Sequence, residues 1–308
     1  MNFKKPKFWD YKKVSVWVFI LYPLTIIYQF IYWIIKIFKP LSKFTIPIIS
    51  VGNIYLGGTG KTPLAREIFK ITKSLNKNPA FIKKPYPYLK DEIKMLEKTG
   101  KIFTSKDRAT SISLCINNNH NIAILDDGFQ DFSIKPDLSI LCFNSKQLIG
   151  NGFIFPSGPL RENFSSIKRA DCIFINGDKN LEFEDKIKEV NASTKIFYSV
   201  YKAKNLDKFK NKKVIAFAGI GNPQNFFDLL KENNINVKKE IPFPDHHNYT
   251  ESDYNYLVAT NESDELLLTT EKDYSRLNEK MKKNFGYVEI DLEIENKNEF
   301  INLIKSKL

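Results

Sequence analysis

Cysteine is scarce in this sequence, with three residues in a chain of 308. They lie in apolar runs and lack the spacing of a metal-binding motif. Because an odd number of cysteines cannot be fully paired within one chain, the count argues against a disulfide framework and favours reduced, buried thiols in a cytosolic compartment. The three residues are Cys115, Cys142 and Cys172.

Arginine is also rare, although the chain is strongly basic. Only five of the 47 Lys and Arg residues are arginine, and the formal net charge is +12. No arginine-rich stripe or aromatic–basic binding motif accompanies that charge, so we do not expect nucleic acid as a partner. A nucleic-acid-binding ATPase would rest on the net charge alone. The lysine excess is compatible with an anionic membrane surface.

Glycine is infrequent too, but four of the 13 glycines lie between residues 52 and 60. An apolar run at 46–51 predicts a buried strand before this cluster, and the apolar spacing at 64–75 predicts a helix after it. Strand, glycine loop, Lys-Thr and helix together predict a phosphate-binding loop. The alternative is a glycine-rich turn with a chance Lys-Thr pair.

Each part of this loop has a chemical role. Glycines let backbone N–H groups approach an anion closely, and the helix start adds further N–H donors. We therefore expect the nucleotide phosphates to bind at Gly57, Gly58, Thr59, Gly60, Lys61 and Thr62. Lys61 would reach the β- and γ-phosphates, and the Thr62 hydroxyl would ligate Mg²⁺. Tyr55 occupies the position where the general motif has glycine, so the loop is a variant.

The stretch 121–130 contains a second strong signal. An apolar strand ends in Asp126 and Asp127, which are followed by glycine. Carboxylates at the carboxyl ends of parallel strands lie where α/β proteins bind ligands, and beside a phosphate loop they hold Mg²⁺ or its water. Asp126 and Asp127 are thus candidate metal ligands. An Asp-Gly turn is the alternative.

Three further regions contribute candidate site residues. The loop 150–162 ends in Arg161, which we interpret as an anion clamp. Pro85 and Pro87 exclude a helix at 83–88, which we expect to be an exposed loop with aromatic and basic groups. Asp91 opens a helix, where an acidic residue is ordinary first-turn chemistry.

The N-terminal stretch 14–35 has no charged side chain and is rich in aromatic and branched residues, with lysines on both sides. Twenty-two uncharged residues are enough to cross a bilayer as a helix. Its Trp and Tyr residues favour the membrane–water boundary. We expect membrane association, either as a span or as an interfacial helix or shallow hairpin. A buried core helix is the alternative, and no small-residue cleavage site indicates a signal peptide.

Strands and helices alternate through the second half as well. Residues 183–210 are weakly patterned and are expected to connect two lobes, and strands are expected at 214–218 and 266–270. The fold class is therefore α/β, with a P-loop NTPase-like α/β/α lobe and a second, smaller α/β lobe after a membrane-associated helical segment. The expected domains are 1–40, 41–205 and 206–308.

Together, these motifs resemble one family, the tetraacyldisaccharide 4′-kinases, which phosphorylate a lipid A precursor. The strings are Val51-Gly-Asn-Ile-Tyr-Leu-Gly-Gly-Thr-Gly-Lys-Thr-Pro63, Leu125-Asp-Asp-Gly-Phe-Gln130, Pro156-Ser-Gly-Pro-Leu-Arg-Glu162, Ala218-Gly-Ile-Gly-Asn-Pro-Gln-Asn-Phe-Phe227, Phe243-Pro-Asp-His-His247 and Thr269-Thr-Glu-Lys-Asp273. One departure is clear, because Ile82-Lys-Lys-Pro-Tyr-Pro-Tyr88 stands where the family usually has a Ser-Arg-Gly-Tyr-Gly-Arg type string.

The resemblance implies an ATP- and Mg²⁺-dependent kinase acting on the 4′-hydroxyl of a tetraacyldisaccharide 1-phosphate. It implies two α/β/α lobes with the active site in the cleft between them, at the cytoplasmic face of a bacterial inner membrane. It assigns catalysis to Asp91 as base, His246 as its partner and Lys61, and adds Gln130 and Arg161 to the nucleotide site. The alternative function is a membrane-associated P-loop ATPase or GTPase switch, or a partitioning protein.

Overall fold

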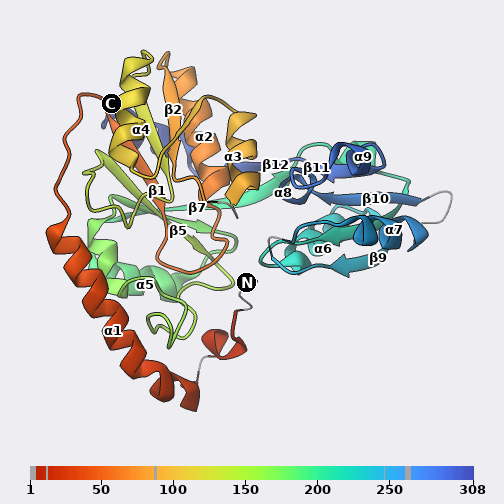
Figure 1. Cartoon of the computed structure of the whole chain (residues 1–308), viewed down its shortest axis with the longest axis horizontal. Coiled ribbons are helices and arrows are strands. Elements are labelled where there is room, and N and C mark those ends of the chain that lie inside the picture. The colour runs from red at the N-terminus through yellow and green to blue at the C-terminus, as the bar shows by residue number, and fades with distance from the viewer. Residues whose placement is uncertain (1–4, 12, 87–88, 246, 261–264) are drawn as a thin grey trace. The chain divides into compact units, whose positions relative to one another are not determined.

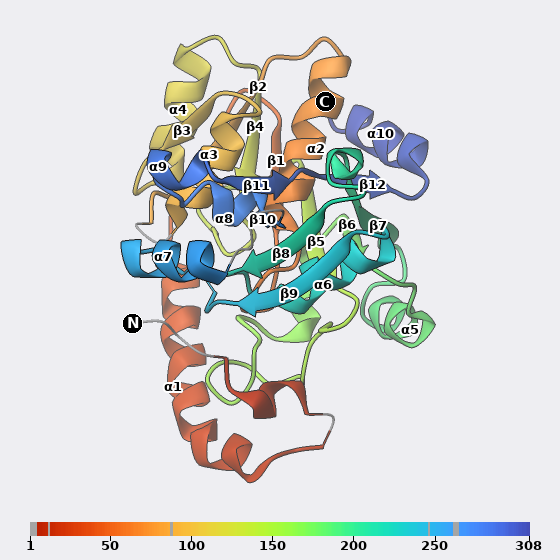
Figure 2. The same cartoon turned by 90° about the vertical axis from the view of Figure 1, so that its right-hand side faces the viewer.

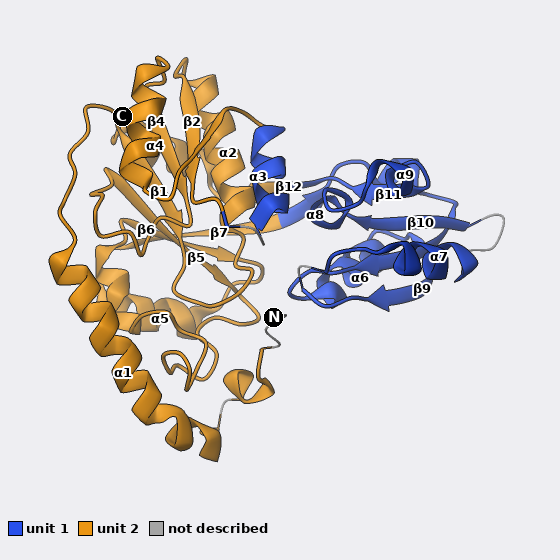
Figure 3. Cartoon of the chain, in the orientation of Figure 1, with its two compact units in different colours: residues 1–4, 86–98, 201–291 blue, residues 5–85, 99–200, 292–308 orange. Residues whose placement is uncertain are grey.

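The computed structural model describes residues 5–11, 13–86, 89–245, 247–260 and 265–308. Two compact units divide these residues (Figure 3). The larger unit comprises residues 5–85, 99–200 and 292–308, and the smaller comprises 86–98 and 201–291. The chain therefore enters and leaves the smaller unit more than once.

The larger unit is built on an eight-stranded sheet in the order β12-β7-β6-β5-β1-β4-β2-β3. Every pair from β3 to β7 is parallel. Because β1 lies between β4 and β5, the loops that follow β1 and β4 leave the same edge side by side. The strands are β1 (Ile48–Gly52), β2 (Pro79–Lys83), β3 (Ile102–Thr104), β4 (Ile122–Asp126), β5 (Leu138–Asn144), β6 (Cys172–Asn176), β7 (Lys195–Ala203) and β12 (Ile290–Ile294).

Helices cover both faces of this sheet, because side chains alternate along each buried strand. On one face Phe81 stacks on Phe69 of α2, and Phe174 meets Phe300 of α10, both with ring centroids 4.7 Å apart. On the other face α4 and α5 pack against the alternate strand residues. These helices are α2 (Lys61–Ser74), α4 (Arg108–Asn117), α5 (Leu181–Val190) and α10 (Lys297–Lys305), with short 3-10 helices η1 (Lys7–Asp10) and η3 (Phe164–Arg169) nearby.

The smaller unit has a parallel four-stranded sheet in the order β11-β10-β8-β9 (Figure 2). The apolar side of α6 packs on one face of the sheet, and α7 and α9 pack on the other. Its elements are α3 (Lys90–Glu97), η4 (Leu206–Lys208), β8 (Lys213–Ala218), α6 (Pro223–Glu232), β9 (Asn236–Pro242), α7 (Glu251–Thr260), β10 (Glu265–Thr270), α8 (Glu271–Tyr274), α9 (Glu279–Lys282) and β11 (Phe285–Val288).

Helix α1 (Val16–Phe38) runs along the outside of the larger unit (Figure 1). It is long and apolar enough to cross a membrane. One narrow side is docked, because the Thr25 hydroxyl donates to Ser157 Oγ at 2.8 Å and Tyr28 donates to the Arg161 carbonyl at 3.2 Å. Most of its other apolar side chains, including Phe19 and Ile27, are exposed.

The α/β fold class is confirmed, as are buried thiols at all three cysteines. Two local expectations are wrong. Residues 183–210 do not form a plain connection, because they hold most of α5 and all of β7. Lys83 does not begin an exposed loop, because it is the last residue of β2 and only 2% exposed.

Candidate active site

The loop between β1 and α2 is shaped by glycine and braced by a buried asparagine. Gly60 has a φ of 91°, in the left-handed region, and precedes the first turn of α2. The Asn53 amide donates to the Tyr55 carbonyl at 2.6 Å and to Thr59 Oγ1 at 3.0 Å. Tyr55 itself is fully buried, so the position where the general motif has glycine supplies a core side chain.

The start of α2 faces the end of β4. The Thr62 hydroxyl donates to Asp126 Oδ2 at 2.9 Å, and Lys61 Nζ lies 3.8 Å from Asp127 Oδ1. The two motifs that the sequence predicted to cooperate are therefore in direct contact. Asp126 is fully buried, and its Oδ1 has no hydrogen-bond partner among the described residues.

Asp127 is held by cations and by an unusual backbone. Its φ of 61° turns the chain just past β4, and the Arg108 guanidinium donates to its carbonyl at 2.7 Å. Arg161 donates to both carboxylate oxygens, at 2.9 and 3.1 Å. Burial alone would raise the pKa of the Asp127 carboxyl, but the charges of Lys61, Arg161 and Lys83 hold it well below its usual range. Asp127 is therefore ionised at neutral pH.

Gln130 and Arg161, both predicted at the nucleotide site, contact each other beside Asp127. Arg161 donates to Gln130 Oε1 at 3.2 Å. The Gln130 amide donates to the Asn53 carbonyl at 2.8 Å and to Glu162 Oε1 at 3.0 Å. This network ties the segment after β4 to the loop after β1, so it fixes the distance between the two motifs.

Sequence reasoning missed three charged residues around this network. Lys83 donates to Asp126 Oδ2 at 2.5 Å. Arg108 donates to Asp131 Oδ2 at 3.0 Å, and Asp131 also accepts from Lys39 at 2.7 Å. A charged residue at the end of an apolar strand was the available signal for Lys83. Arg108 and Asp131 carry no comparable local signal.

Asp91, the predicted base, lies in the first turn of α3 in the smaller unit and is 4% exposed. Arg276 donates to its Oδ2 through both Nε, at 3.0 Å, and Nη2, at 2.5 Å. Lys272 Nζ is 3.9 Å from the same oxygen. His246, the predicted partner of Asp91, lies outside the described residues.

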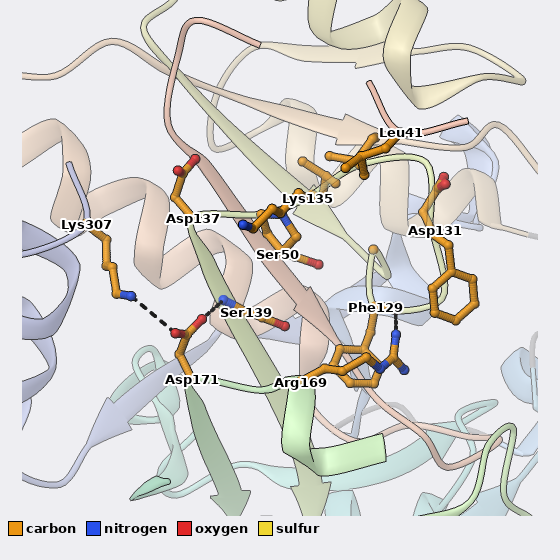
Figure 4. A pocket seen from close by; sticks show the side chains of 15 residues that line it. Leu41, Ser50, Phe129, Asp131, Lys135, Asp137, Ser139, Arg169, Asp171 and Lys307 are labelled. Carbon is orange, nitrogen blue, oxygen red and sulfur yellow. Dashed lines mark hydrogen bonds and ion pairs between the residues drawn. The ribbon is translucent and has the colours of Figure 1, made fainter. Parts of the chain in front are cut away.

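A cavity of about 660 Å³ opens elsewhere in the larger unit (Figure 4). Ser50, Ser139 and Leu125 line it from the sheet, and Phe129 and Arg169 line it from the segments beyond β4 and β5. Strand alternation puts these sheet residues on the face opposite Asp126 and Thr62. The cavity is thus distinct from the glycine loop.

Comparisons with known proteins agree with this arrangement. A family model described as tetraacyldisaccharide-1-P 4′-kinase matches residues 17–308. A tetraacyldisaccharide 4′-kinase from Pelagibacter ubique (strain HTCC1062) is 40% identical, with 99% of this chain and 98% of that protein covered. A second from Rickettsia canadensis (strain McKiel) is 30% identical, with 95% and 94% covered. The crystal structure of LpxK from Aquifex aeolicus in complex with ATP is 25% identical, covers 94% of this chain and 99% of that one, and gives a TM-score of 0.74.

Proposed function

The chain belongs to the tetraacyldisaccharide-1-P 4′-kinase family, and on that premise we propose that it transfers the γ-phosphoryl group of ATP to the 4′-hydroxyl of a tetraacyldisaccharide 1-phosphate. The products are ADP and the 4′-phosphorylated disaccharide, a lipid A precursor. The observation that carries this proposal is the contact between the glycine loop and the end of β4, where Thr62 meets Asp126 and Lys61 approaches Asp127.

We assign ATP binding to the lobe at residues 41–205. Backbone N–H groups of the loop from Gly57 to Thr62 would receive the β- and γ-phosphates. Lys61 and Arg161 would counter the charge on the transferring group, and Gln130 would keep Arg161 in place through their 3.2 Å contact. Such fixed charges are usually the largest contribution to phosphoryl transfer.

The residues at the end of β4 fit Mg²⁺. The buried Oδ1 of Asp126 lacks a hydrogen-bond partner among the described residues, and oxygen donors are the ligands that Mg²⁺ takes. Thr62, Asp126 and Asp127 would hold the ion directly or through water. When bound, Mg²⁺ would neutralise the negative charge that develops on the phosphate during transfer.

The acceptor hydroxyl needs a base, and we assign this role to Asp91. A sugar hydroxyl is a weak nucleophile, and a positioned carboxylate can accept its proton during transfer. Arg276 fixes the Asp91 carboxylate in place at 3.0 Å or less. His246 would orient Asp91 or take the proton onward.

We also propose that the enzyme works at the cytoplasmic face of the bacterial inner membrane, because its acceptor is an acylated glycolipid. The exposed apolar side of α1 and the many lysines support a membrane surface as a partner. The larger part of α1 would contact the same lipid phase that holds the substrate.

The test supplies ATP, Mg²⁺ and purified tetraacyldisaccharide 1-phosphate to the full chain and measures the product mass. A gain of one phosphoryl group on the disaccharide, lost in a Lys61→Ala variant, supports the proposal. A membrane-associated ATPase or GTPase switch would instead hydrolyse nucleotide when a protein partner is added and leave the glycolipid unchanged. That outcome would overturn the kinase assignment.

A further inference from the structure

Lys83 is a buried lysine whose ammonium group lies against Asp126. Its side chain is 2% exposed, and its Nζ donates to Asp126 Oδ2 at 2.5 Å. Parallel pairing matches Ile82 of β2 with Leu125 of β4, so the next residue of each strand lies side by side at the sheet edge. Burial of an ammonium group is unfavourable unless an opposite charge compensates it, so this pair depends on both partners.

The same edge carries an excess of positive charge. Asp126 accepts from Lys83 and Asp127 accepts from Arg161, while Lys61 lies 3.8 Å from Asp127. Among the described residues, three cations therefore surround two carboxylates. A divalent cation that arrives alone adds charge of the sign already in excess, whereas one that arrives with ATP brings phosphate charges that compensate it.

We propose that Lys83 is an internal counter-ion that weakens the binding of a free divalent cation at Asp126, so that the site takes up the metal together with ATP. The ammonium group competes with the metal for the same carboxylate. Lys83 thus disfavours binding of the free cation and leaves binding of the cation together with ATP. This inference rests on the proposed metal site at Thr62 and Asp126, and it adds a role for a residue outside that set.

Titration of Mn²⁺ without nucleotide, followed by the electron paramagnetic resonance of unbound Mn²⁺, tests the proposal on the full chain. Lys83→Met should bind Mn²⁺ at least about tenfold more tightly than the wild type, because a positive charge near the metal is removed. Lys83→Arg keeps the charge and should resemble the wild type. Lys84→Met is the matched control, since Lys84 pairs with Asp131, which retains Lys39 and Arg108.

Equal Mn²⁺ affinity in the wild type and Lys83→Met overturns the proposal, as does tight Mn²⁺ binding by the wild type without nucleotide. Lys83→Gln replaces Lys83→Met if circular dichroism shows that the latter does not fold. Titration with Mn²⁺ and ATP together distinguishes failure of the proposed metal site from failure of the proposed role of Lys83. Undiminished binding by Asp126→Asn refutes the metal site itself, whereas weakened binding there with no effect of Lys83→Met on free Mn²⁺ refutes only the role of Lys83.

Discussion

Arg276 binds Asp91 through two nitrogens, Nε and Nη2, which donate to the same carboxylate oxygen at 3.0 and 2.5 Å. The side chains of Arg276 and Asp91 are both almost fully buried. The guanidinium is itself fixed, because its Nη1 donates to the Gly219 carbonyl at 2.7 Å and to Asp273 Oδ1 at 2.9 Å. The proposed base is therefore oriented by a side chain that is anchored at several points.

Arg276→Lys should reduce turnover by about tenfold or more, because lysine keeps the charge but loses the planar fork, and a small displacement of a catalytic group is costly. ATP affinity should stay near normal, since Asp91 is not assigned to the nucleotide. Steady-state kinetics with separate ATP titrations measures both. Lys280→Arg, at a lysine that is 65% exposed, is the control. Unchanged turnover in Arg276→Lys would show that the paired hydrogen bonds from Arg276 to Asp91 have no catalytic consequence.

Asp91→Ala and His246→Ala should each lower turnover by about a hundredfold or more, as the loss of acid–base groups does. The double variant should be little worse than the poorer single variant. Removal of either residue already abolishes the contribution that the two make together. Single-turnover kinetics on all three variants measures the coupling. Fully additive losses would mean that the two residues act independently.

Lys61→Ala should lower turnover by about two powers of ten or more, because it removes a fixed positive charge beside the phosphoryl group. Lys73→Ala, near the far end of α2, should leave turnover within about twofold, since surface changes away from a site have small effects. Initial rates at saturating ATP provide the comparison. Near-normal turnover in a folded Lys61→Ala protein would contradict the assignment of the phosphate site.

Asp131→Asn should destabilise the protein by about 3–5 kcal/mol at pH 7, because it leaves the buried Arg108 guanidinium without its carboxylate partner. Burial alone would raise the pKa of the Asp131 carboxyl, but Lys39, Ser133 and Arg108 hold it well below its usual range. The unfolded chain therefore takes up protons first as the pH falls, so the stabilisation is present above about pH 4 and is lost below it.

Urea unfolding of the wild type and Asp131→Asn at pH 7, 5 and 3.5 measures this difference. The gap between the two proteins should be largest at pH 7 and shrink at pH 3.5. Asp178→Asn, at an exposed position, is the control and should change stability by less than about 0.5 kcal/mol. A gap that widens as the pH falls would refute the proposed ionisation of Asp131.

Removal of residues 1–38 should release the protein from anionic vesicles, because it deletes all of α1 and with it most of the exposed large apolar side chains of the described residues. A finer variant, Ile20→Asp with Ile27→Asp, alters two outward residues that are 58% and 55% exposed. Vesicle co-sedimentation should show weaker binding by this variant. Leu181→Asp, at an apolar residue outside α1 that is 71% exposed, is the control. Equal sedimentation of all variants would place the membrane contact elsewhere.

The sequence predicts the strand, glycine loop and helix at β1 and α2, and the strand that ends at Asp126, because each signal is local. An apolar strand followed by Gly57 to Thr62, or by Asp126, can be recognised without knowledge of the rest of the chain. The family resemblance and the α/β fold rest on the same kind of local motif, and both are confirmed. The reason for Tyr55 at a position where the general motif has glycine is not visible in the sequence. The structure shows that Tyr55 is a buried core residue.

The parts that escaped prediction depend on distant residues or weak patterns. Lys83 meets Asp126 only because β2 pairs with β4 in one register. Arg276 reaches Asp91 across 185 positions of sequence. The stretch 183–210 misled because α5 buries only Phe183 and Ile187 among many charged residues, so its apolar pattern is sparse.

The docking of Thr25 restricts how α1 can meet a lipid phase. The helix has 23 residues, and Thr25 lies near its middle, bonded to Ser157 and the Ile154 carbonyl. If a docked α1 crossed a bilayer, the loop that contains Ile154 and Ser157 would lie at the hydrocarbon midplane, where irregular backbone facing lipid is not tolerated. With Thr25 docked, α1 can enter only one leaflet, parallel to the surface. A crossing helix would first have to detach from Ser157, so the docked conformation is compatible with a monotopic arrangement and not with a membrane span.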